Sequence, residues 1–98
     1  MKKVMEQLFE TEKQKWLKKS YEELKKLGDE YDPYTYVLEV NDQEYPVNIL
    51  MLESRDEYVQ PCLTVYDCDD RFRIFGILVF RHNCSIDWVV DRDNTVHV

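Results

Sequence analysis

The sequence predicts an α+β domain in which an N-terminal helix packs on a five-stranded antiparallel β-meander. Two observations predict this class. Apolar residues recur at helical spacing over 1–27, and the period changes to two over 34–90. Pro33 lies in the short linker between the two parts and disfavours helix just before it. The length of 98 residues suits a single domain, 1–98, with a core of its own.

The first part of the chain is predicted to be helical. Lysine and glutamate fill the gaps between its apolar residues, which are Met5, Leu8, Phe9, Trp16, Leu17, Leu24 and Leu27. Two pairs with capping-box spacing, Thr11 with Gln14 and Ser20 with Glu23, each fit the start of a second helix. We favour one long helix, with a kink near residue 11 or a split as the alternatives. Gly28 suits the left-handed position just after the helix.

Five strands separated by polar turns are predicted after the linker. They cover about 34–40, 44–52, 58–66, 72–81 and 85–90, and 95–98 is expected to add a short extended end. Asn41 and Asp42 are expected to form the first hairpin turn. Pro46 and Pro61 indicate a strand start, an edge or a bulge, because proline cannot donate to the sheet ladder.

The strand at 72–81 is predicted to be central, because apolar residues occupy both of its faces. They are Phe72, Ile74, Leu78 and Phe80 on one face, and Phe75, Ile77 and Val79 on the other. One helix covers one face of a sheet, so the other face needs a second copy of the chain, a permanent partner or a strongly bent sheet. Gly76 fits such a bend. A homodimer is therefore one expected alternative.

The net charge of −7 is unevenly distributed. Residues 1–27 carry eight Lys and five Glu, which gives +3, and the other residues carry five Arg and fifteen acidic groups, which gives −10. Phosphate contact requires a basic footprint, so no direct nucleic-acid binding through the acidic part is expected. Acidity mainly supports solubility, and the alternative is steering toward a basic protein partner. No apolar run has the length of a membrane span, so no membrane partner is expected.

No catalytic or cofactor motif is present, so we expect neither an enzyme nor a bound cofactor or metal. The three cysteines form an odd set without a Cys-x-x-Cys pair, which favours a reducing, cytoplasmic location. A zinc site of Cys68, His82 and Cys84 matches no common spacing. The aspartate-rich turns lack the combination of glycine and bidentate glutamate that a helix–loop–helix calcium site requires.

Two groups of residues are predicted to bind a partner. In a meander the turns after odd-numbered strands lie at one end of the sheet, which would gather an acidic rim of Asp42, Asp67, Asp69, Asp70, Asp91 and Asp93. Tyrosines beside acidic residues are typical of protein-binding patches, and here they are Tyr31, Asp32, Tyr34 and Tyr36.

These features predict a non-enzymatic protein-binding module. Its most concrete form is a small acidic inhibitor, of the immunity or anti-defence type, that occludes a basic nucleic-acid-handling partner. One alternative is a small-ligand-binding domain with an apolar pocket around Trp16, Trp88 and Phe75. The other alternative is a dimeric structural subunit that associates through the strand at 72–81.

Overall fold

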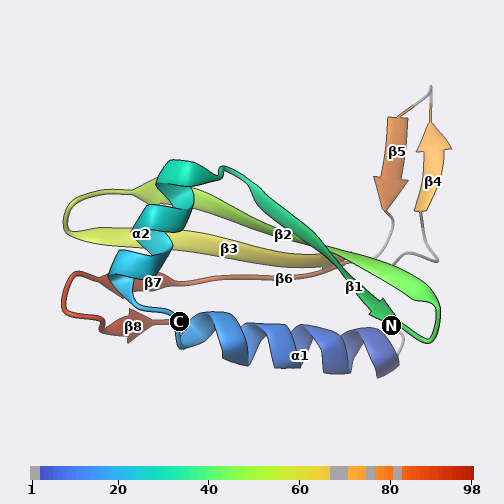
Figure 1. The fold of residues 1–98 in the computed structure, drawn as a ribbon, viewed down its shortest axis with the longest axis horizontal. Helices are drawn as coiled ribbons and strands as arrows, with labels where there is room; N and C mark the ends of the chain where they lie inside the picture. Colours follow the sequence, from blue (N-terminus) through green and yellow to red (C-terminus); the bar gives the residue numbers. More distant parts are fainter. Residues whose placement is uncertain (1–2, 67–70, 75–76, 81–82) are drawn as a thin grey trace.

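The computed structural model describes residues 3–66, 71–74, 77–80 and 83–98, with side chains for 4–66 and 83–98. Two N-terminal helices pack on a six-stranded antiparallel sheet, and a separate two-stranded hairpin projects from one end of this sheet (Figure 1). The predicted α+β class is therefore confirmed. The elements in chain order are α1 Lys3–Leu17, α2 Tyr21–Glu30, β1 Tyr34–Val40, β2 Gln43–Ser54, β3 Tyr58–Tyr66, β4 Arg71–Ile74, β5 Ile77–Phe80, β6 Asn83–Asp87, β7 Val89–Asp91 and β8 Val96–His97.

The helical part is two helices, so the preference for one continuous helix was wrong and the split is confirmed. The break lies where the second capping-box pair predicts a helix start. Ser20 is the N-cap of α2, and its hydroxyl accepts a hydrogen bond from the backbone N–H of Glu23 at 3.2 Å. The backbone N–H of Tyr21 donates to Oδ1 of Asn94 at 2.9 Å, so a distant turn satisfies another free donor of this helix end. Local capping and a tertiary contact together begin α2 here.

Gly28 lies inside α2 and not after its end, which corrects its predicted left-handed role. The helix continues to Glu30, and Tyr31 is the C-cap. A Cβ atom added to Gly28 would lie 2.6 Å from Cγ of Met51 on β2. Glycine is required here because α2 packs closely on β2, and the backbone conformation plays no part.

The sheet order is β1-β2-β3-β7-β8, and β6 also pairs with β3. The predicted strands at 34–40 and 58–66 are confirmed, and the one at 44–52 forms with slightly wider bounds. The predicted turn at Asn41 and Asp42 is confirmed as well. Both residues have positive φ angles, 50° and 65°, which is typical of the two-residue type I′ hairpin turn.

Pro61 explains why the predicted strand at 85–90 is interrupted. Its carbonyl accepts the backbone N–H of Trp88 at 3.2 Å, but proline has no N–H to return the bond. The pairing with β3 therefore stops at Trp88, with β6 before it and β7 after it. On its other side Pro61 pairs with Met51, next to the bulge in β2. Pro46 lies near the start of β2, so both proline predictions are confirmed.

The predicted central strand at 72–81 is not part of the six-stranded sheet, and β3 is central instead. Strands β4 and β5 pair antiparallel with each other, with Ile74 opposite Ile77. This register leaves two positions between the strands. Phe75 and Gly76, which occupy these positions in the sequence, lie outside the described residues. The expected extended end forms β8.

The core lies between the helices and one face of the sheet. Alternate residues of β2 and β3 are buried, as period-two strands with one covered face require. The buried apolar residues are Met5, Trp16, Leu24, Tyr45, Val47, Ile49, Val59, Leu63, Val65, Trp88 and Val90. Neither described helix covers the opposite face of the sheet. The side chains of the candidate site lie on this uncovered face.

Candidate functional site

The described residues of the predicted acidic rim do not gather at one end of the sheet. Asp42 lies in the turn between Val40 and Gln43, whereas Asp91 pairs with Tyr58 at the opposite end of the sheet. Along β3 these ends are separated by about 27 Å, at about 3.4 Å per residue. Asp93 follows Asp91 and lies at the same end of the sheet. Because β4 and β5 add no strand to the six-stranded sheet, β6 pairs antiparallel with β3, which reverses the predicted direction of the last strand. Asp67, Asp69 and Asp70 lie outside the described residues.

The predicted tyrosine patch does come together, at the start of β1. The ring of Tyr34 lies edge-on to the rings of Tyr31 and Tyr36, with centroid distances of 5.5 and 5.6 Å, and 6.2 Å from that of Trp16. Tyr31 is 56% exposed, and Asp32 beside it is also exposed. The other two tyrosines are half-buried against the core. The exposed part of the patch is therefore small.

Tyr36 has a structural role that the sequence did not indicate. Its hydroxyl donates to the carboxylate of Glu12, the buried acidic residue of α1, and accepts the indole N–H of Trp16 at 2.9 Å. Burial, followed by the hydrogen bond to this carboxylate, raises the pKa of the Tyr36 hydroxyl. Lys15 lies 3.7 Å from the same carboxylate. This network ties α1 to β1.

Two of the three residues of the predicted apolar pocket, Trp16 and Trp88, are described. Trp16 and Trp88 both belong to the core, and Phe75 lies outside the described residues. A hollow of about 270 Å³ adjoins Trp16 between the helices and β1, and a second of about 300 Å³ adjoins Tyr31 and Pro33. Trp88 lines neither of these hollows.

The sheet face turned away from the helices is here called the open face. It carries alternate residues of the strands, as their registers and burial show: Thr35, Val37, Glu39, Glu44, Pro46, Asn48, Leu50, Glu53, Tyr58, Gln60, Cys62, Thr64, Tyr66, Ser85, Asp87, Val89 and Asp91. Five of these residues are acidic. Of the predicted acidic rim, only Asp91 is among them.

Two carboxylates of the open face lie directly opposite each other. Glu39 of β1 pairs in register with Glu44 of β2, and both are exposed. Among the described residues neither carboxylate has a hydrogen bond or an ion pair. The signal was present in the sequence, because a two-residue turn at 41–42 places residue 39 opposite residue 44.

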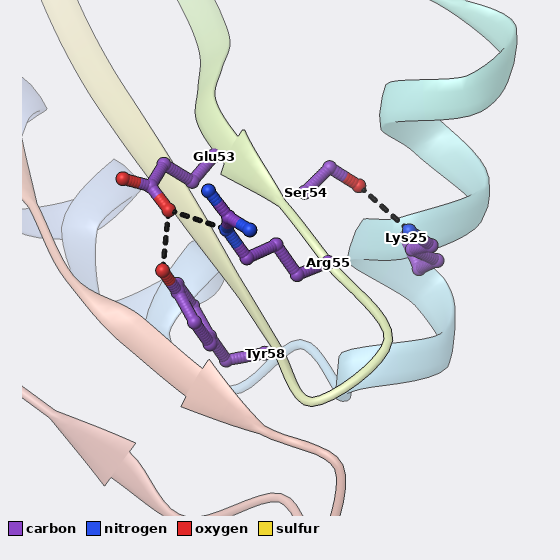
Figure 2. Close-up of polar contacts among 5 residues, drawn as sticks. All are labelled: Lys25, Glu53, Ser54, Arg55 and Tyr58. Carbon is purple, nitrogen blue, oxygen red and sulfur yellow. Dashed lines mark hydrogen bonds and ion pairs between the residues drawn. The ribbon is translucent and has the colours of Figure 1, made fainter.

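The other acidic side chains of the open face have partners. Glu53 accepts hydrogen bonds from the hydroxyl of Tyr58 and, at 2.9 Å, from Nε of Arg55, and these two bonds lower its pKa (Figure 2). The carboxylate of Asp87 accepts a hydrogen bond from Nε2 of Gln60 at 2.9 Å. Oδ2 of Asp91 lies 2.7 Å from Nε2 of His97. Figure 2 also shows Ser54 directed to the helix side, where its hydroxyl accepts Nζ of Lys25 at 3.1 Å.

The centre of the open face is neutral. The hydroxyls of Thr64 and Ser85 lie 3.2 Å apart, and the thiol of Cys62 lies 3.4 Å from Ser85. Leu50 pairs with Cys62 and is 36% exposed, and nearby Leu52 is 48% exposed. A neutral, partly apolar centre with acidic groups around it resembles the anatomy of a protein–protein interface.

Within the part of the chain that the structure describes, no group of three or more His, Cys, Asp or Glu side chains could hold a metal ion. Neither described helix has the length and apolar composition needed to cross a membrane. Comparison with protein-family models, with curated proteins and with solved structures finds no match.

Proposed function

We propose that this chain is a non-enzymatic protein-binding module whose open face docks on a basic surface of a partner protein. The observation that carries the proposal is the pair of opposed carboxylates, Glu39 and Glu44. In its most concrete form the module is an acidic inhibitor that occludes the groove of a nucleic-acid-handling protein. The mechanism is steric and electrostatic, with the open face in place of the predicted acidic rim.

The Glu39–Glu44 pair works against folding of the chain alone. Like charges directly opposite each other in a sheet destabilise it, by about 0.2–1 kcal/mol for pairs of this kind. No described cation relieves the repulsion in the free chain. A lysine or arginine of a partner would contact both carboxylates at once, and arginine would do so with its planar group of donors.

The rest of the chain fits such a partner. Residues 28–98 carry a charge of −10, which speeds encounter with a basic protein and makes it salt-dependent. The neutral centre, with Leu50 and Cys62, supplies the area from which water is excluded. Tyr31, the C-cap of α2, adds an exposed aromatic ring near the start of β1.

The test compares the wild-type chain with Glu39→Lys as immobilised bait in lysate of the cells that naturally express it. The matched control is Asp29→Lys, an exposed position of α2 with the same change in charge. The wild type and the control should capture the same basic protein at low salt and release it at high salt. Glu39→Lys should bind that protein at least about tenfold more weakly, which corresponds to about 1.4 kcal/mol.

The mechanism is then tested on the purified captured protein by competition with nucleic acid. We expect the wild-type chain to compete with nucleic acid for it, and Glu39→Lys to compete poorly. If Glu39→Lys captures the same proteins as the wild type with equal yield, the open face is not the docking surface. If the captured protein still binds nucleic acid when saturated with this chain, occlusion is wrong.

A further inference from the structure

Strand β1 forms one edge of the six-stranded sheet, because β2 is its only neighbour among the described strands. Val40 and Gln43 flank the two-residue turn, so they exchange hydrogen bonds, and alternate residues of β1 before them do the same. The residues between these, Thr35, Val37 and Glu39, therefore direct their backbone N–H and C=O groups outward. The edge offers three donors and three acceptors in one row.

This edge has only one of the features that normally prevent edge-to-edge pairing, which is the charged side chain of Glu39. β1 contains no lysine, no proline and no register shift, and its seven residues form a complete strand. The opposite edge is formed by the shorter strands β6 and β8, which are five and two residues long. Val37 points to the open face and is 53% exposed. On the helix side Tyr36 and Leu38 are only half-buried, although they pack against the core.

We propose that β1 pairs antiparallel with β1 of a second copy of this chain, with the two-fold axis at Val37. Val37 then faces Val37 of the second copy, and the two exchange both backbone hydrogen bonds. Thr35 and Glu39 of each copy face Glu39 and Thr35 of the other. Six hydrogen bonds form in this register, and every outward group of the three residues is used.

The distribution of charge favours a second copy of this chain as the partner that pairs with the β1 edge. Pairing through the edge places each Glu39 opposite a neutral threonine, and Tyr36 of one copy opposite Leu38 of the other. Association of two open faces would instead bring their five carboxylates against each other, which charge repulsion opposes. The edge is therefore self-complementary, whereas the open face is not.

The dimer would join the two open faces into one continuous sheet surface with two Glu39–Glu44 pairs. A partner with two basic sites could then bind both copies at once and gain avidity. The pairing itself does not depend on the proposed function, because it concerns the chain alone. The two proposals can therefore fail separately.

The test is size-exclusion chromatography with light scattering on the purified full chain, from micromolar to millimolar concentration. The wild type should be a dimer at the upper concentrations. Val37→Lys places a charge on the paired edge and should be a monomer with an unchanged circular dichroism spectrum. Leu50→Lys, a control on the open face but away from the edge, should remain a dimer.

Amide hydrogen exchange of the wild type gives a second measurement that needs no variant. The amides of Thr35, Val37 and Glu39 should exchange at least about tenfold more slowly at the concentration where the dimer forms. A monomer at every concentration would overturn the proposal. A dimer that Leu50→Lys abolishes and Val37→Lys retains would also overturn it, and would assign the contact to the open face.

Discussion

Gly28 of α2 and Met51 of β2 are in such close contact that a Cβ atom on the glycine would lie 2.6 Å from Cγ of the methionine. This distance is well inside van der Waals contact, so a larger residue would move either the helix or the methionine side chain. The contact fixes how closely α2 approaches the sheet. It also explains a glycine in mid-helix, where glycine normally lowers stability.

Gly28→Ala should therefore lower the free energy of unfolding, although alanine is the better helix former by about 1 kcal/mol. Overpacking costs about 1–3 kcal/mol, so we expect a net loss of up to about 2 kcal/mol in urea denaturation. The control is the same substitution in a Met51→Ala background, where space is available. There it should stabilise the chain, and equal effects in the two backgrounds would refute the packing explanation.

Glu39→Lys should raise the stability of the chain while it weakens partner binding. The substitution replaces a repulsive pair with an attractive one opposite Glu44, a gain of about 0.2–1 kcal/mol. Urea denaturation at low and high salt measures the gain, which salt should reduce because both groups are exposed. Asp29→Lys is the control for the change in net charge. A destabilised Glu39→Lys would show that the opposed pair does not repel.

Tyr36→Phe should destabilise the chain by about 1–3 kcal/mol, because it leaves the buried carboxylate of Glu12 without its hydroxyl donor. The indole N–H of Trp16 also loses its acceptor. Tyr31→Phe, at a ring that is 56% exposed, is the matched control and should change stability little. Thermal denaturation compares the two variants. Equal melting temperatures would mean that the Glu12–Tyr36 bond contributes nothing.

Glu53 should make stability depend on pH in the acid range. Hydrogen bonds from Tyr58 and Arg55 lower its folded-state pKa from the ordinary value of 4.5. A lowered folded pKa gives stability that is present above the unfolded pKa and is lost as pH falls through the folded pKa. Between about pH 5 and pH 3, Tyr58→Phe should therefore lose less stability than the wild type in urea titrations. Parallel pH profiles would contradict the assignment.

Ser20→Ala should cost about 1 kcal/mol, because the hydroxyl of Ser20 is the N-cap of α2. Ser54→Ala removes an exposed hydroxyl that accepts Lys25, and it should change stability by less than about 0.5 kcal/mol. Circular dichroism of the Ser20 variant should also show frayed helix. If both serine variants unfold at the same urea concentration, the break between the helices has another cause.

Several elements could be predicted because their signals are local. The change from helical to two-residue period placed β1 and β3, and the Asn41–Asp42 turn placed the first hairpin. The Ser20–Glu23 pair marks the start of α2, although one long helix was preferred. The same turn determines that Glu39 faces Glu44, so this part of the candidate site was also contained in the sequence. In each case the interacting groups are a few residues apart, and spacing alone specifies their geometry.

Other features depend on contacts between distant residues, and only the tertiary structure decided them. An apolar run such as 72–81 fits either one central strand or a hairpin, so its pattern does not distinguish the two. In the structure it contributes β4 and β5, which pair with each other as a hairpin. That choice reversed the direction of the next strand and moved Asp91 to the end of the sheet far from Asp42. The sequence by itself determined the fold class and the local turns, because periodicity and turn chemistry act over a few residues. Strand order, the role of Gly28 and the location of the acidic surface required the tertiary structure, because they depend on which distant segments pack together.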